Sequence, residues 1–102
     1  MIVEYIRYEA ANEQVDALLE AYRKAAAHLA AAPECLRHEV ARGVEDRGVV
    51  VVRIEWSSLE AHERSFRGGP HFPPFLALVR PFIPMIREMK HYEPLQGSAG
   101  GA

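Results

Sequence analysis

Apolar residues recur with two different periods along this chain, and the changes of period divide it into strands and helices. Residues 1–9 are rich in Ile, Val and Tyr and alternate loosely, as in a strand with neither face strongly polar. After Asn12, a candidate helix cap, apolar residues recur three and four positions apart. This spacing predicts a helix that ends near Pro33. Its apolar stripe consists of Val15, Leu18, Leu19, Tyr22, Ala26 and Leu29.

The next two apolar segments predict a β-hairpin. Residues 35–44 alternate through Leu36, His38 and Val40, and Asp46-Arg47-Gly48 has the composition of a turn. The run that starts at Val49 is apolar except for Arg53 and Glu55 and ends at Trp56. Two strands of this kind, joined by a short turn, are expected to pair in antiparallel orientation.

Three helical pieces and a last strand are expected after Trp56. Ser57 and Glu60 have the spacing of a capping box, which predicts a helix directly after Trp56, and Gly68-Gly69-Pro70 predicts its end. Helical spacing resumes between residues 72 and 86. Pro81 and Pro84 lack the amide hydrogens of a continuous helix, so two short pieces with a kink are expected. Met89–Pro94 then predicts a strand in which Met89, His91 and Glu93 point opposite to Lys90 and Tyr92.

The order strand, helix, strand, strand, helix, strand predicts an α+β fold of the ferredoxin-like split βαβ type. Its helices would cover one face of a four-stranded antiparallel sheet. Apolar residues on the other face predict a partner sheet, hence a homodimer formed through the open sheet face, a dimeric α+β barrel. The domain is expected to span residues 1–95, and residues 96–102, which are small and polar, to form a flexible C-terminal tail.

Composition excludes several classes of partner and compartment. A formal net charge of −2 provides no basic surface, so no nucleic-acid partner is expected. Apolar runs fall far short of the roughly 20 residues of a membrane span, so no membrane partner is expected either. The N-terminal residues lack the features of a signal peptide, and the single cysteine, Cys35, excludes an intramolecular disulfide framework. Cytoplasmic localisation is therefore expected.

Two segments of the chain carry a resemblance to a known family. Ile54–His62 looks like the strand-to-helix junction of the antibiotic biosynthesis monooxygenase family of dimeric α+β barrels, and Ser65–Phe75 looks like its pocket-lining stretch. The resemblance spans roughly residues 2–94. It is stronger to small bacterial members with segments like Cys35-Leu36, Val79–Phe82 and Glu88–Glu93.

The resemblance implies a pocket between sheet and helices in each subunit. Some members of the family oxygenate hydroquinones or polyketide anthrones there with neither metal nor flavin. Ground-state dioxygen is a triplet and reacts slowly with closed-shell molecules, so the substrate must supply the first electron as a phenolate or carbanion. The protein then provides an apolar cavity, a proton acceptor, and dipoles or cations for developing oxyanions. The expected ligand is a small aromatic molecule, quinol-like or anthrone-like.

Four aromatic residues are candidates for the walls of such a cavity: Trp56, Phe66, Phe72 and Phe75. The alternative for the phenylalanines is an ordinary packed core, because helical apolar stripes usually form one. Trp56 is the first catalytic candidate, since a buried indole N–H needs a partner and could donate to a ligand.

Two arginines and a tyrosine are candidates for holding an anionic oxygen or the substrate. Arg7 shares the strand face of Val3 and Tyr5, and it could hold a phenolate or superoxide if that face looks toward the helices. The alternative is an ion pair with Glu63 or Glu88. Arg80 could point at a ligand, or compensate the negative end of the third helix.

Histidines are the candidate proton acceptors, because histidine alone titrates unperturbed near neutral pH. His62 shares the inward helical stripe with Phe66, His71 precedes Phe72, and His91 lies on the last strand. His62 and His71 lead because of these aromatic neighbours. Each of the three could instead be an ordinary structural or surface histidine.

Neither a metal nor a cofactor is predicted. The chain lacks paired-cysteine and His-Glu-x-x-His spacings, and Gly68-Gly69-Pro70 follows a helix rather than opening one as a phosphate cradle does. Two further functions stay open: a non-catalytic module that binds or senses a small molecule, and a haem-binding or haem-degrading protein in which His71 substitutes for the axial ligand. The function expected first is a monooxygenase independent of metal and flavin.

Overall fold

The computed structural model describes residues 1–96. The strands are β1 (Ile2–Glu9), β2 (Cys35–Arg42), β3 (Val49–Trp56) and β4 (Ile86–Tyr92). The helices are α1 (Asn12–Ala31), the π-helix η1 (Ala61–Phe66), α2 (Phe72–Val79) and the 3₁₀-helix η2 (Arg80–Met85).

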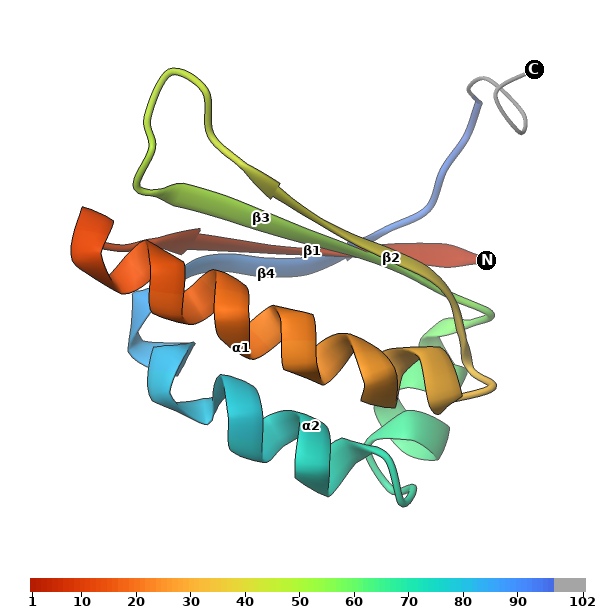
Figure 1. Cartoon of the computed structure of the whole chain (residues 1–102). Coiled ribbons are helices and arrows are strands. Elements are labelled where there is room, and N and C mark those ends of the chain that lie inside the picture. Colours follow the sequence, from red (N-terminus) through yellow and green to blue (C-terminus); the bar gives the residue numbers. More distant parts are fainter. Residues whose placement is uncertain (97–102) are drawn as a thin grey trace.

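The four strands form one antiparallel sheet in the order β2-β3-β1-β4, with β1 in the interior beside both β3 and β4. Helices α1 and α2 lie on the same side of this sheet (Figure 1). The ferredoxin-like α+β fold and the hairpin of β2 and β3 are thereby confirmed. The other face of the sheet carries no helix among the described residues, which is the arrangement that the predicted dimeric barrel requires.

The core lies between the sheet and the helices. On β3 the residues Val50, Val52, Ile54 and Trp56 are buried, while those between them are only half-buried. The stripe of α1 is buried nearly as predicted, through Val15, Leu18, Ala21, Tyr22, Ala25 and Leu29. Alternation on β3 and helical spacing on α1 therefore describe two surfaces that face each other.

The predicted helix starts are each displaced by one residue. Helix α1 begins at Asn12, so Ala11 is the capping residue, and the Gln14 side chain accepts a hydrogen bond from the Ala11 amide at 3.3 Å. After β3, the hydroxyl of Ser58, not of Ser57, accepts from the Ala61 amide at 3.0 Å. A serine side chain satisfies either first turn equally well, so local sequence alone does not decide between the two serines.

The helix after Trp56 is wound as a π-helix, which spacing alone did not predict. The Arg67 amide donates to the His62 carbonyl five residues earlier, at 3.2 Å. His62 and Phe66 are both buried on its inner side. The helix stops at Gly68 as predicted: a β-carbon there would lie 2.7 Å from the Arg64 carbonyl oxygen, a distance that only glycine tolerates. π-Helical turns often occur at functional sites.

The C-terminal helical region is divided as expected. Helix α2 passes into η2 at Arg80, and Pro81 and Pro84 lie in this second piece. Strand β4 begins at Ile86, three residues before the predicted start, and ends at Tyr92. Met89 and His91 pair with Ile6 and Glu4, and Lys90 and Tyr92 pair with Tyr5 and Val3, so the predicted alternation is confirmed for these four residues, while the register shifts between Ile86 and Glu88. Most of the predicted tail, residues 97–102, lies outside the described residues. Within residues 1–96, none of the helices combines the length and apolar character that crossing a membrane requires.

A buried pair of hydroxyls joins β1 to α1, since the Tyr8 and Tyr22 oxygens lie 2.7 Å apart. Either Tyr8→Phe or Tyr22→Phe leaves one buried hydroxyl without a partner, and we expect each to lower the free energy of unfolding by about 1–2 kcal/mol. The double variant leaves neither and should lose less than the sum of the two. Urea unfolding of the four proteins measures this coupling, and simple additivity would contradict it.

Candidate active site

A cavity of about 150 Å³ lies between the sheet and the helices. Its aromatic walls are Tyr8, Tyr22, Trp56, Phe66, Phe72 and Phe75, and aliphatic side chains of β1, β3, α2, η2 and β4 also line it. Only three lining residues are charged or titratable near neutral pH: Glu4, His62 and Arg67. The cavity is therefore an apolar chamber with one polar end.

The predicted aromatic walls are brought together. The Phe66 ring makes edge-to-face contacts with the rings of Phe72 and Phe75 at centroid distances of 5.6 and 5.7 Å, and it lies 4.8 Å from the Trp56 ring. These residues belong to the packed core and line the cavity at once. The phenylalanines are thus both part of the packed core and walls of the cavity.

Glu4 is the central group of the polar end. It has the strand parity of Ile6 and Tyr8, so its side chain points toward the helices and is only 1% exposed. Its Oε1 accepts a hydrogen bond of 3.1 Å from the Trp56 indole N–H, whereas its Oε2 has no partner among the described residues. Burial raises the pKa of the Glu4 carboxyl, against the smaller opposing effects of the Trp56 hydrogen bond and the Arg67 charge.

His62 lies between Glu4 and a second histidine. Its ring stacks on the Trp56 indole at a centroid distance of 4.4 Å and an angle of 10°. Its Nε2 is 3.6 Å from the Glu4 Oε1, and its Nδ1 is 2.7 Å from the Nε2 of His91. Burial, with the charges of Arg67 and His91 adding to it, lowers the pKa of His62 to about 3, so this imidazole is neutral near pH 7.

One oxygen of Glu4 and one nitrogen each of His62 and His91 lie within 4.8 Å of one another, close enough to be weighed as an ion site. A single ion, however, would bind only one nitrogen of His62. Glu4 and His91 approach different nitrogens of that ring, and the contact to His91 has the length of a hydrogen bond. These contacts of the two His62 nitrogens suit the transfer of protons among the three side chains.

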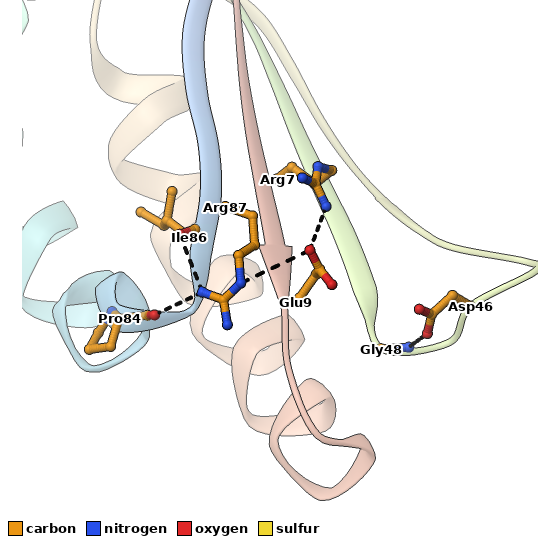
Figure 2. A network of polar contacts seen from close by, with 7 residues as sticks. All are labelled: Arg7, Glu9, Asp46, Gly48, Pro84, Ile86 and Arg87. Carbon is orange, nitrogen blue, oxygen red and sulfur yellow. Dashed lines mark hydrogen bonds and ion pairs between the residues drawn. The ribbon is translucent and has the colours of Figure 1, made fainter.

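Arg7 and Tyr5 are not part of the cavity. Alternation correctly grouped them with each other, but their face of β1 is the one that points away from the helices. Arg7 donates to Glu9 at 2.7 Å, and Figure 2 shows Glu9 between Arg7 and Arg87. The Tyr5 hydroxyl accepts from Arg53 at 3.3 Å. The partner of Arg7 is thus neither of the two glutamates considered, Glu63 and Glu88.

His71 and Arg80 also lie outside the lining of the cavity. His71 immediately precedes α2, and its carbonyl accepts from the Phe75 amide at 3.3 Å. Arg80 is exposed at the start of η2. Of the four predicted catalytic residues, the structure brings two together at the polar end, Trp56 and His62.

Sequence reasoning missed Glu4 and Arg67 and ranked His91 below His71. A signal for Glu4 was present, because a lone acidic residue shares its strand face with Ile6 and Tyr8. No comparable local signal pairs His91 with His62. These two residues meet because β4 lies beside β1, where His91 is directly opposite Glu4.

The fold and this site define a small α+β protein with an apolar cavity between its sheet and its helices. Comparison with known proteins extends this description. The family model for antibiotic biosynthesis monooxygenases matches residues 1–78, and the chain therefore belongs to that family. The uncharacterised protein YczJ of Bacillus subtilis (strain 168) is 24% identical over 74 residues, which cover 72% of this chain and 78% of YczJ.

Solved structures show the same fold. A protein of this family from Chloroflexus aurantiacus J-10-fl superimposes with a TM-score of 0.75 at 24% identity, covering 96% of each chain. SnoaB, a cofactor-independent oxygenase from Streptomyces nogalater, superimposes with a TM-score of 0.72 at 19% identity, covering 94% of each chain. At these identities the likeness establishes the fold alone.

Glu4 and His62 make opposite contributions to the pH dependence of the free energy of unfolding. In the unfolded chain His62 binds a proton below about pH 6.5, whereas in the folded chain it does so only below about pH 3. The contribution of His62 to the free energy of unfolding is therefore lost as the pH falls from about 6.5 to about 3. Glu4 has its pKa raised above 4.5, so the folded chain keeps a proton that the unfolded chain releases. The Glu4 contribution is complete below pH 4.5 and is lost as the pH rises through the folded-state pKa.

Glu4→Gln removes the pH-dependent contribution of Glu4 to stability and keeps the hydrogen bond, because the amide oxygen can still accept from the Trp56 N–H. We expect this variant to gain stability relative to wild type as the pH rises from 4.5 to 8. Urea unfolding of both proteins at several pH values measures the difference. A stability difference that does not change with pH would contradict the raised pKa of Glu4.

Proposed function

We propose that this protein is a monooxygenase that uses neither metal nor flavin and oxidises a small aromatic substrate, quinol-like or anthrone-like, with dioxygen in the cavity between sheet and helices. Membership of the antibiotic biosynthesis monooxygenase family supports this, and SnoaB, which shares the fold, is a cofactor-independent oxygenase. The observation that carries the proposal is the Glu4 carboxyl: it is buried at the end of an aromatic chamber, and one of its oxygens has no partner within residues 1–96.

Glu4 has the properties of a general base for a phenol. An ordinary carboxylate is a poor acceptor for a phenolic proton, because the pKa of a phenol is about 10. Burial raises the pKa of Glu4 and so narrows this gap. The Trp56 N–H holds one carboxyl oxygen in place and leaves Oε2 for the substrate hydroxyl.

The reaction balances without a further reactant. Glu4 takes a proton from one hydroxyl of a hydroquinone, and the phenolate gives one electron to dioxygen, forming a phenoxyl radical and superoxide. These combine in a new C–O bond, and the resulting peroxide takes the proton from Glu4. Cleavage of the O–O bond with loss of the ring hydrogen at that carbon yields a hydroxylated quinone and one water. The Arg67 charge near Glu4 favours the anionic states.

The size of the cavity favours the quinol-like end of this substrate range. A cavity of about 150 Å³ is the size that accommodates benzene in an engineered protein core. A single-ring hydroquinone fits such a space with little rearrangement, whereas a three-ring anthrone requires the walls to open. The same comparison argues against haem, which is much larger still.

Glu4→Gln tests the proposal directly. With a single-ring hydroquinone and metal-stripped protein, we expect wild type to consume oxygen above the rate of autoxidation, and Glu4→Gln to lower kcat by about 10²-fold or more. Trp56→Phe removes the orienting N–H and should cause a smaller loss. An oxygen electrode measures the rate, and mass spectrometry with ¹⁸O₂ shows one labelled atom in the product.

His38→Ala is the matched control, because His38 lies on β2 away from the cavity. Oxygen uptake that is equal in wild type and Glu4→Gln would overturn the proposal. Thermal stabilisation by the same quinols without any oxygen uptake would instead support a non-catalytic binding module.

We also propose that two copies pair through the sheet face that lacks helices. Tyr5, Arg7, Val51, Glu88 and Tyr92 line a shallow hollow on this face, and Tyr92 is 45% exposed. The arginines of β1 and β3 on this face already pair with carboxylates of their own strands, Arg7 with Glu9 and Arg53 with Glu55. A second copy can therefore cover the face without burying these arginines unpaired.

Val51→Asp places a charge in the centre of this face and should convert a dimer into a monomer. Val44→Asp is the control, since Val44 is 80% exposed in the loop between β2 and β3. Size-exclusion chromatography with light scattering measures the mass of each variant. A wild-type monomer, or an unchanged dimer in Val51→Asp, would contradict pairing through this face.

A further inference from the structure

We propose that Glu4, His62 and His91 form a proton relay that connects the buried end of the cavity to solvent and sets the charge of Glu4. This inference rests on the proposed function in one respect, the role of Glu4 as the base. The relay itself depends only on the contacts of three side chains. His62 and His91 then act through Glu4, without touching the substrate's reacting atoms.

The three groups come from three separate elements and lie close together, with one ligand atom of each within 4.8 Å of the others. Glu4 belongs to β1, His62 to η1 and His91 to β4. His62 presents its Nε2 to Glu4 at 3.6 Å and its Nδ1 to His91 at 2.7 Å. An imidazole contacted at both nitrogens can accept a proton at one and release it at the other. The contact of 3.6 Å is longer than a hydrogen bond, so proton transfer to His62 requires the Glu4 carboxyl to rotate toward it.

Burial decreases from Glu4 and His62 to His91, so His91 is the member of the relay that reaches solvent. Glu4 and His62 are 1% and 3% exposed, whereas His91 is only half-buried. His62 also lines the cavity, whereas its Nδ1 contacts His91, a residue outside the lining. Glu4 can therefore exchange its proton through His62 while a substrate occupies the space beside Oε2.

The need for such a path follows from the burial of Glu4. Its raised pKa keeps the carboxyl protonated over a wider range of pH, and a protonated carboxyl cannot accept a proton from a phenol. A substrate that fills the cavity also removes solvent from Glu4. Loss of the resting proton then requires an exit on the other side, which the two histidines provide.

The transfer keeps both imidazoles neutral before and after it. With Glu4 protonated, its O–H faces the His62 Nε2, and the His62 Nδ1–H donates to the Nε2 of His91. When Glu4 ionises, its proton passes to the His62 Nε2, the Nδ1 proton passes to His91, and His91 releases its own Nδ1 proton to water. Both histidines change tautomer together. His62 passes the proton on in one step because burial disfavours its cationic form.

The charged and titratable neighbours of the relay come from several elements. Burial raises the pKa of Glu4 and lowers the pKa of both histidines. The charge of Arg67, just after η1, opposes the shift of Glu4 and adds to that of the histidines, and Glu63 on η1 opposes the shift of His91. Tyr8 and Tyr22, from β1 and α1, are the other titratable groups near Glu4. Arg67 thus favours ionised Glu4 and neutral histidines, the state that accepts a substrate proton.

The relay can be tested without any substrate. In protein labelled with ¹⁵N-histidine, the nitrogen shifts of His62 and His91 report each tautomer between pH 5 and 9. We expect both rings to change tautomer in one shared pH step in wild type, and in Glu4→Gln we expect this step to be lost. A fixed tautomer at either histidine, or a shared step that persists in Glu4→Gln, would overturn the relay.

Kinetics provide the second readout. His91→Ala should lower kcat for hydroquinone oxidation about 10-fold or more with KM little changed, and added imidazole should restore the rate by replacing the missing ring. His38→Ala should behave as wild type, with no response to imidazole. A His91→Ala protein with full kcat, or a loss that imidazole does not restore, would contradict the relay.

The two proposals fail in different ways. A wild-type protein that consumes no oxygen would refute the proposed function, and the tautomer measurement would then decide the relay by itself. Oxygen consumption that depends on Glu4 but not on His91 would keep the function and refute the relay.

Discussion

The placement of one carboxyl group, that of Glu4, is the constraint on which the site depends. An interior β1 strand with helices on one side forces alternate side chains into the core, and Glu4 occupies one of those positions. Burying a carboxyl costs free energy unless it is hydrogen-bonded or protonated. The Trp56 N–H compensates one oxygen, and the other has no partner in the described part of the chain. The role proposed for Glu4 as a base gives a reason for the fold to keep a group that costs stability.

Trp56 and His62 contact this carboxyl, and Phe66 lines the same cavity. Trp56 ends β3 directly opposite Ile2, so its indole reaches back toward β1. The π-helix then places His62 flat against that indole and Phe66 beside it. Burial against this aromatic cluster is also what raises the pKa of Glu4 and lowers that of His62. The packing of the aromatic side chains therefore also determines the direction of both pKa shifts.

The two faces of β1 have different surroundings. Glu4, Ile6 and Tyr8 line the cavity, while Tyr5 and Arg7 lie on the face without helices. On that second face the arginines of β1 and β3 pair with neighbouring carboxylates, Arg7 with Glu9 and Arg53 with Glu55. Under the two proposals above, β1 carries a ligand site on one face and an interaction surface on the other, because successive side chains point to opposite sides.

The sequence by itself determined the order of the elements, the hairpin, the division of the C-terminal helix at its prolines, the family, and the aromatic residues Trp56, Phe66, Phe72 and Phe75. These features depend on residues that are close together along the chain. Only the tertiary structure decided which face of β1 looks toward the helices, because alternation groups Arg7 with Tyr5 and Glu4 with Ile6 without saying which group is inside. It also decided that His91, and not His71, adjoins His62. That contact depends on the pairing of β1 with β4, which joins Glu4 to a residue far away in sequence, and such pairing is set by the packing of the whole domain.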